Sequence, residues 1–220
     1  MTTTTAIIGV GNIGSAVATH LVNGGERVIL ASASDDDAKR LADKLGEHAN
    51  AAPVAEAIDA ADAVLFAVWF DVTKELVARH GPALPGKVVI DPSNPISIDE
   101  QGNIKRTLPD GVSAGSVIAG LMPPTAHFVK AFGTLAAASF ASGANRLPRR
   151  AVLFYATDDL DAASVAERLI SAAGFDPVKA GGVDASLRIE VFGDLHGMGG
   201  LEGRLVDSDE ATSLVGAAVR

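Results

Sequence analysis

The sequence predicts an α/β protein with a doubly wound, mainly parallel sheet, helices on both faces and a small C-terminal helical extension. Three observations support this fold class. Short apolar runs alternate with helix-like stretches, which is typical of βαβ units. The glycine-rich segment 9–14 joins the first apolar run to the first helix-like stretch. The chain has 220 residues, 48% of them apolar, so it is long enough to bury one large core.

The first half of the chain alternates regularly between the two kinds of element. Short apolar runs bounded by turn residues predict strands at 6–8, 27–30, 49–52, 64–68 and 87–91. The stretches between them predict helices at 12–23, 36–45, 53–59 and 72–80. Gly24 and Gly46 follow two of these helices, and glycine suits the left-handed position after a helix.

The second half is less regular. We expect a proline-bounded loop at 92–95 and an exposed polar excursion at 99–111. The remaining elements expected are a helix at 116–121, a strand at 127–131, a loop at 143–150, a strand at 151–156, a helix at 162–173, a strand at 176–180, a helical stretch at 185–194 and an irregular one at 197–200. This divides the chain into a main domain, residues 1–182, and an extension, residues 183–220, packed on that domain or on a dimer partner.

Composition excludes several classes of protein. The chain has no cysteine, which excludes disulfide scaffolds, thiolate metal sites and thiol nucleophiles. Its net charge of −9 has the wrong sign for nucleic-acid binding. The five histidines show no metal-ligand spacing, so no metal is expected. The N-terminus lacks a charged region before its apolar run, and prolines interrupt the longest uncharged window, so we expect a cytoplasmic protein that does not bind membranes.

The segment Gly9-Val10-Gly11-Asn12-Ile13-Gly14 is a G-x-G-x-x-G motif between a strand and a helix, as in Rossmann-like dinucleotide-binding domains. Gly9 allows the tight turn, Gly11 lets the backbone approach a pyrophosphate, and Gly14 lets the helix pack closely on the sheet. The first-turn amides, including those of Asn12 and Ile13, supply positive potential without a cationic side chain. The main domain is therefore predicted to bind NAD(P).

The end of the second strand favours NADP, with NAD possible. An NAD-selective site carries an acidic residue there, whereas this chain has Ser32, Ala33 and Ser34, which leave room for a 2′-phosphate. Three acids follow at Asp35–Asp37. They either face solvent and complement the helix dipole or face the nucleotide and oppose a phosphate, and the sequence leaves both open.

Two further segments end strands at the same edge of the expected sheet. Val68 and Trp69 should lie beside the cofactor, where Trp69 either stacks on a planar ligand or packs in the protein. Asn94 and Pro95 follow the fifth strand; Asn94 either bonds the nicotinamide or ribose or forms a structural turn. Phe70 is a weaker candidate for contact with a substrate.

With these motifs in place, the chain resembles the NADP oxidoreductases that depend on the deazaflavin coenzyme F-420. The resemblance covers about residues 5–195. It is carried by the segments Ile8–Gly14, Val28–Ser32, Asp91–Pro95, Val129–Thr134 and Ala180–Gly182, followed by Arg188 and Glu190. The chain departs from the family at Ala33-Ser34, where an arginine is common, near Trp69-Phe70, where a proline is common, and at Gly133, where asparagine is usual.

The resemblance implies hydride transfer between NADP(H) and a small planar acceptor such as F-420, a flavin or a quinone. It also implies a homodimer and an acceptor pocket lined by Phe132, Gly133, Thr134 and Leu135. Hydride transfer needs alignment more than a proton-transferring group, which agrees with the lack of an evident acid–base pair. His127 and His196 are weak candidates for such a role. The alternative is a non-catalytic redox sensor that binds NADP(H).

Overall fold

The computed structural model describes residues 3–217. Within them, one eight-stranded sheet has the order β10-β9-β8-β5-β4-β1-β2-β3, and β6 and β7 form a separate hairpin. The strands β1 to β5, with β8, run parallel. β9 is antiparallel to β8 and joins it through the single residue pair Lys130–Ala156, and β10 is parallel to β9. The α/β, mainly parallel fold predicted from the sequence is confirmed.

The elements alternate along the chain as the pattern of apolar runs predicts. The strands are β1 (Thr4–Ile8), β2 (Arg27–Ala31), β3 (Ala49–Ala51), β4 (Ala63–Phe66), β5 (Val88–Asp91), β6 (Ile96–Ile98), β7 (Ile104–Arg106), β8 (His127–Lys130), β9 (Val152–Ala156) and β10 (Asp176–Gly181). The helices are α1 (Asn12–Asn23), α2 (Asp35–Leu45), α3 (Val54–Ala60), α4 (Phe70–His80), α5 (Ala114–Leu121), α6 (Ala137–Gly143), α7 (Leu160–Ala172), α8 (Ser186–Ile189) and α9 (Ser208–Ala217), with 3-10 turns at Gly81–Ala83 and Val183–Ala185.

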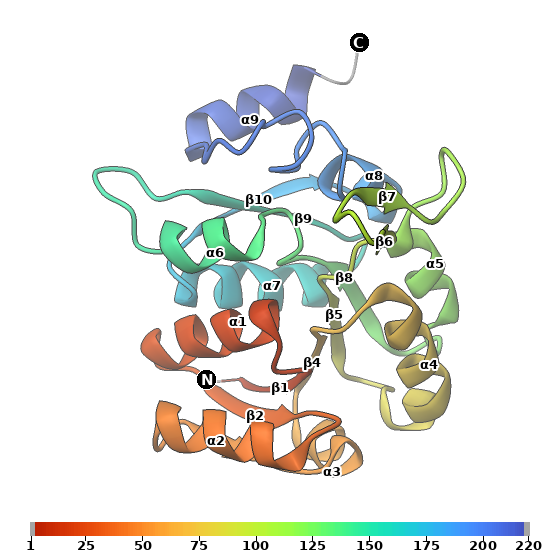
Figure 1. Ribbon diagram of the computed structural model, residues 1–220, viewed down its shortest axis with the longest axis vertical. Helices are drawn as coiled ribbons and strands as arrows, with labels where there is room; N and C mark the ends of the chain where they lie inside the picture. Colours follow the sequence, from red (N-terminus) through yellow and green to blue (C-terminus); the bar gives the residue numbers. More distant parts are fainter. Residues whose placement is uncertain (1–2, 218–220) are drawn as a thin grey trace.

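Helices cover both faces of the sheet (Figure 1). Ile7 packs in a core with α1, α2, α6 and α7, whereas the next residue, Ile8, packs in a second core with α3, α4 and α5. This alternation buries both faces, which explains why the strands read as continuous apolar runs. A third cluster joins β9 and β10 to α8 and α9. The extension thus packs on the outer strands of the same chain; the boundary at residue 182 stays a prediction.

Four expectations differ from the structure. The excursion at 99–111 has no buried residue, as expected, but its residues Ile104 to Arg106 form an unexpected strand that pairs with Ile96 to Ile98 around a turn held by Asp99. The helix α6 was not expected. Within 185–194 the helix α8 covers only four residues, and the rest is irregular. The fourth strand ends at Phe66 rather than Val68, because Trp69 already caps α4.

The strand order reverses between β1 and β4, whose neighbours lead outward in opposite directions. In open α/β sheets this switch point is where a ligand crevice forms, at the carboxyl ends of the strands. The loops after β1 and β4 both lie there. Among residues 3–217, no helix is long and apolar enough to cross a membrane.

Candidate functional site

The glycine-rich loop after β1 is held in a shape that only glycine allows at two positions. Gly9 has φ +102°, and its N–H donates to Ala31 O at 2.8 Å. A Cβ on Gly9 would lie 2.4 Å from Ala67 O, and one on Gly14 would lie 1.9 Å from Gly9 O. Larger residues would therefore push α1 away from the loop and the loop away from β4.

Gly11 differs from these two glycines because it faces open space. No atom lies within 4 Å of a Cβ built on it, and the residue is exposed. It precedes α1, whose first turn has neither a side-chain cap nor an acidic residue. The N–H groups at the start of α1 therefore point their partial positive charge at an open surface, which suits a pyrophosphate. The residues present fit a dinucleotide.

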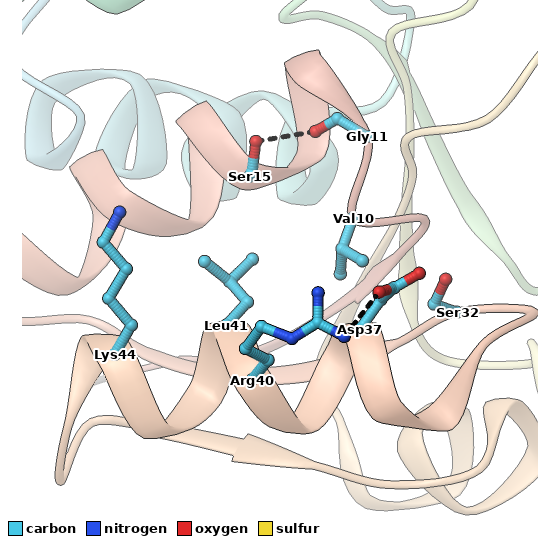
Figure 2. Close-up of a pocket in the computed structure, with 8 residues that line it drawn as sticks. All are labelled: Val10, Gly11, Ser15, Ser32, Asp37, Arg40, Leu41 and Lys44. Atoms are coloured by element: carbon cyan, nitrogen blue, oxygen red, sulfur yellow. Dashed lines mark hydrogen bonds and ion pairs between the residues drawn. The ribbon is translucent and has the colours of Figure 1, made fainter.

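A pocket of about 380 Å³ lies beside this loop, between α1 and α2 (Figure 2). Its lining is Val10, Gly11, Ser15, Ser32, Asp37, Arg40, Leu41 and Lys44. The predicted residues Gly11 and Ser32 thus share one cavity. Arg40 and Lys44, which sequence reasoning missed, bring two positive charges to it. Their i, i+4 spacing places them on one face of α2, and that spacing is the signal that could have found them.

The three acids at the start of α2 do not all behave alike. Ser34 caps the helix, its hydroxyl accepting from Asp37 N–H at 3.3 Å, so that hydroxyl is engaged. Asp35 and Asp36 are exposed and do not line the pocket, whereas Asp37 does. The Asp37 carboxylate lies 3.2 Å from the Arg40 guanidinium, and Figure 2 shows Arg40 extending toward it. Asp37 therefore pairs with the arginine that lines the same pocket.

Val68 and Trp69 lie at the switch point, and Phe70 does not face it. A Cβ on Gly9 would lie 2.7 Å from a γ-carbon of Val68, so Val68 borders the loop. Trp69 is 57% exposed, which leaves its ring free to contact a ligand. Phe70 is buried in the core beneath α4. Ala33 is exposed at the end of β2 but does not line the pocket.

Asn94 joins three segments of the chain. Its Nδ2 donates to Gly133 O at 3.1 Å, and its Oδ1 accepts from Val191 N–H at 2.7 Å. Pro95, which follows it, is buried. Of the two alternatives for Asn94, the geometry therefore favours a structural role, because both ends of the amide are already bonded to backbone groups.

The segment predicted to line an acceptor pocket is largely part of the core. Phe132, Thr134 and Leu135 are all buried, and Phe132 packs edge-on against Phe140 with 6.2 Å between ring centroids. Gly133 lies against the loop after β5, since a Cβ there would be 2.4 Å from Pro92 O. These side chains offer no open surface to an acceptor in this structure, so their predicted role gains no support from it.

A buried network of charges holds the same edge of the sheet together. Lys130 Nζ donates to Asp91 Oδ2 at 2.7 Å and to Ser93 O, and lies 3.9 Å from Glu190 Oε1. The Glu190 carboxylate also accepts from the first amides of α5, Ala114 N–H and Gly115 N–H, at 3.1 and 2.9 Å. Arg106 from the hairpin lies 3.5 Å from it. Sequence reasoning did not connect these residues, because they are far apart in the chain.

His196 is a structural histidine in this arrangement. Its Nδ1 accepts from Met198 N–H at 2.8 Å, so Nε2 carries the proton and lies 2.9 Å from Gly133 O. Burial, with a smaller contribution from the charge of Lys130, lowers the pKa of His196 to about 4, despite its bond to Gly133 O. Both ring nitrogens are therefore occupied and the ring is neutral at pH 7, which disfavours a role in proton transfer.

Comparison with known proteins supports this assignment of the loop. Residues 4–95 match the family model described as NADP oxidoreductase, coenzyme F420-dependent. That range runs from β1 to the proline-bounded loop after β5, and so contains the glycine-rich loop, the pocket and Trp69. A search of curated proteins found no match.

Solved structures share the fold over most of the chain. The hypothetical protein SMa0349 from Sinorhizobium meliloti is 29% identical, with a TM-score of 0.78, over 94% of this chain and 97% of that one. A protein from Arthrobacter sp. FB24, provisionally named an F420-dependent NADP reductase, is 22% identical, with a TM-score of 0.70, over 82% and 86%.

A larger enzyme shares the fold only in part. A reductive aminase from Aspergillus terreus, solved with NADPH and ethyl levulinate, is 23% identical, with a TM-score of 0.61, over 85% of this chain and 58% of that one. This chain thus spans little more than half of that enzyme. Over residues 4–95, this chain is thus similar to the family of F420-dependent NADP oxidoreductases.

Proposed function

We propose that the protein is an oxidoreductase that transfers hydride between NADP(H) and a small planar acceptor such as a deazaflavin, a flavin or a quinone. The observation that carries the proposal is the loop Gly9–Gly14, in which two glycines fix the turn and the third leaves the start of α1 open. The family match over the same residues supports NADP as the nucleotide. When bound, NADPH supplies the hydride.

The residues of the pocket have distinct tasks in this proposal. The amides at the start of α1 bind the pyrophosphate, because they are uncapped and carry the positive end of the helix dipole. Arg40 and Lys44 bind the 2′-phosphate, taking the place of the arginine that is common directly after the second strand in the family. Ser32, at the end of β2, adds a hydroxyl to the same pocket.

The acceptor side depends on positioning rather than on proton transfer. Trp69 is exposed beside the loop and can cover one face of a planar ring. His196 is neutral and fully hydrogen-bonded, and Lys130 is engaged with carboxylates, so neither is available as an acid or base. Hydride transfer to a planar ring fits such a site, because alignment of the two rings provides most of the required organisation.

The test is a titration with NADPH and with NADH, followed by the fluorescence of Trp69, the chain's single tryptophan. Turnover is then measured with F-420, a flavin and a quinone in separate assays. Tight NADPH binding with reduction of one acceptor supports the proposal. NADPH binding without reduction of any acceptor would favour the redox sensor instead, and failure to bind either nucleotide would refute both.

A homodimer is part of the same proposal and rests on the family resemblance. Light scattering coupled to size-exclusion chromatography measures it directly. A mass near twice 22.4 kDa is expected, and a mass near 22.4 kDa at micromolar concentration would refute the dimer without affecting the nucleotide site.

A further inference from the structure

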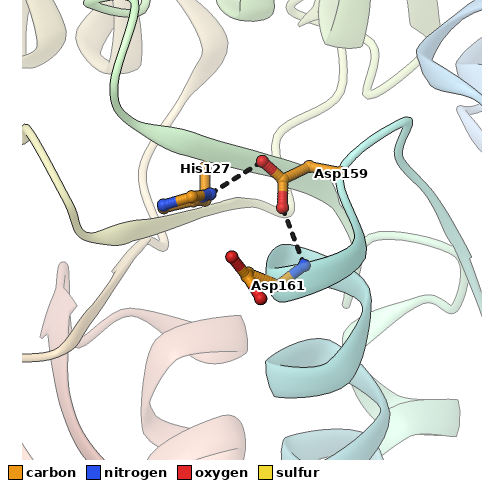
Figure 3. A group of neighbouring side chains, drawn as sticks. All are labelled: His127, Asp159 and Asp161. Carbon is orange, nitrogen blue, oxygen red and sulfur yellow. Dashed lines mark hydrogen bonds and ion pairs between the residues drawn. The ribbon is translucent and has the colours of Figure 1, made fainter.

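The edge of the sheet opposite the glycine-rich loop carries a group of side chains that the proposed function does not use. His127 begins β8, and Asp159 and Asp161 lie at the start of α7. One potential ligand atom from each of the three lies within 4.8 Å of the others. Figure 3 shows the imidazole and the two carboxylates converging from separate elements. We propose that these residues form a binding site for a divalent transition-metal ion such as Zn²⁺.

The donor set suits such an ion. One imidazole nitrogen and two carboxylate oxygens are common zinc ligands, and three protein ligands leave a position for water. His127 Nδ1 and Asp159 Oδ2 are 2.7 Å apart. Tetrahedral zinc, with ligands at about 2.0–2.1 Å, needs neighbouring ligand atoms about 3.3 Å apart. A small side-chain rotation therefore opens the pair enough to admit the ion.

The ligands are held in place by a second set of contacts. Asp159 Oδ1 accepts from the N–H groups of Asp161 and Ala162, at 2.8 and 2.9 Å. The buried Thr157 links the two ligand-bearing elements, because its hydroxyl donates to Phe128 O at 2.6 Å and accepts from Asp159 N–H at 3.0 Å. Such supporting bonds preorganise a metal site and distinguish it from a cluster of mobile surface acids.

The charge at the group also favours a cation. Neither Asp159 nor Asp161 has a lysine or arginine within ion-pair distance among residues 3–217. Two carboxylate groups thus face one imidazole without a neighbouring cationic side chain, and a divalent ion would compensate their charge.

The sequence could not indicate this site. His127 and Asp159 are 32 residues apart, and the histidine spacing gave no ligand pair. They meet because β9 runs antiparallel to β8 and its last residue, Ala156, pairs with Lys130 at the end of β8, so that the chain after β9 runs back along β8 toward His127. The ion would therefore connect the start of β8 to the start of α7, a structural role remote from the nucleotide.

The test is calorimetric titration of the untagged chain with Zn²⁺, together with its melting temperature with and without the ion. We expect one ion per chain, bound at micromolar concentration, and a higher melting temperature. His127→Gln and Asp161→Asn should each weaken binding at least tenfold. The side chain of Asp161 makes no hydrogen bond within residues 3–217, so Asp161→Asn should not disturb folding.

Two control variants separate this site from adventitious binding. His80→Gln removes another histidine, and Asp184→Asn removes an exposed carboxylate near Asp158. Both should leave the affinity for Zn²⁺ within about twofold. No saturable binding below about 1 mM, or binding that survives both His127→Gln and Asp161→Asn, would overturn the proposal. NADPH binding, measured on the same samples, should not change with any of these variants.

Discussion

The two halves of the sheet organise their polar groups in different ways. Around β1, β2 and β4 the site is made of backbone: Gly9 and Gly14 fix the loop, and uncapped amides face outward. Around β5, β8 and β9 the polar groups are side chains, with Lys130 buried between Asp91 and Glu190. The glycine-rich loop is suited to receive a charged ligand, whereas the Lys130 network has already satisfied its own charges.

The difference explains what each half can do. A binding site made of backbone amides has little free-energy cost while it is unoccupied, because water forms hydrogen bonds with the exposed amides until a ligand replaces it. A buried charge must be paired at all times, because an uncompensated charge in the interior is strongly unfavourable. The glycine-rich loop is therefore suited to binding, and the buried Lys130 network to fixing the position of the surrounding loops.

The largest effect is expected from breaking the buried network. Lys130→Met should lower the free energy of unfolding by about 3–5 kcal/mol, because Asp91 and Glu190 lose their shared cation. Urea unfolding at pH 7 measures the change. Lys179→Met, at an exposed position in β10, is the control and should change stability by less than about 0.5 kcal/mol. A loss below about 1 kcal/mol for Lys130→Met would mean that the network is not stabilising.

The second-largest expected effect is a loss of stability at acidic pH, caused by His196 in the C-terminal half. The pKa of His196 is lowered to about 4 by burial, while an unfolded histidine has a pKa of about 6.5. Between about pH 6.5 and pH 4, His196 is therefore protonated in the unfolded chain but neutral in the folded chain. The free energy of unfolding falls across this range as the pH drops, by up to about 3 kcal/mol. Above about pH 6.5, His196 is neutral in both states, and this loss of stability is absent.

Urea unfolding between pH 7 and pH 4.5 tests this dependence. His196→Gln should flatten the dependence of the free energy of unfolding on pH in that window. It should also lower stability at every pH, because the hydrogen bonds of His196 to Gly133 and Met198 are lost. The same substitution at His80 should leave the slope in place. An unchanged slope in His196→Gln would assign the pH dependence to other groups.

The third prediction tests the open face of the loop. Gly11→Val should weaken NADPH binding about a hundredfold, equal to about 2.7 kcal/mol, because its side chain would occupy the place of the pyrophosphate. The melting temperature should stay the same, since no protein atom lies within 4 Å of the added Cβ. Gly120→Val, at another open position, should leave binding intact. Equal NADPH affinity in Gly11→Val would show that the nucleotide binds elsewhere.

The smallest expected effect is a difference between the affinities for NADPH and NADH. Arg40→Ala should weaken NADPH binding about tenfold, or about 1.4 kcal/mol, and NADH binding less than about twofold, because NADH has no 2′-phosphate. Asp37→Asn should shift the preference toward NADPH, since it releases Arg40 from its ion pair. Arg79→Ala, an exposed arginine on α4, is the control. A parallel loss for both nucleotides in Arg40→Ala would refute contact with the 2′-phosphate.

The N-terminal half could be predicted closely from the sequence. The limits expected for the first helix, Asn12 to Asn23, match α1, because a glycine-rich start and Gly24 mark both ends. The loop was predictable for the same reason: its members are adjacent in the chain. Arg40 was missed because it reaches the pocket from one turn farther along α2, where a sequence motif does not place it.

The C-terminal half could be predicted less well, and the reason is physical. Asn94 bonds Gly133 and Val191, which lie 39 and 97 residues away. Such contacts depend on the order of the strands and on the direction of β9, and the local pattern of apolar residues predicts neither. Alanine-rich α6 lacks a capping side chain, and the short α8 ends after one turn, so neither has a clear boundary signal.

The formally neutral loop affects how nucleotide affinity depends on ionic strength. The first 30 residues contain only Glu26 and Arg27 as charged side chains, so in the proposed complex the two phosphates common to NADH and NADPH would meet backbone dipoles. The additional phosphate of NADPH would meet exposed Arg40 and Lys44, whose attraction dissolved salt screens. The ratio of the two affinities should therefore fall as salt is added, and the preference for NADPH becomes a property of the medium as well as of the protein.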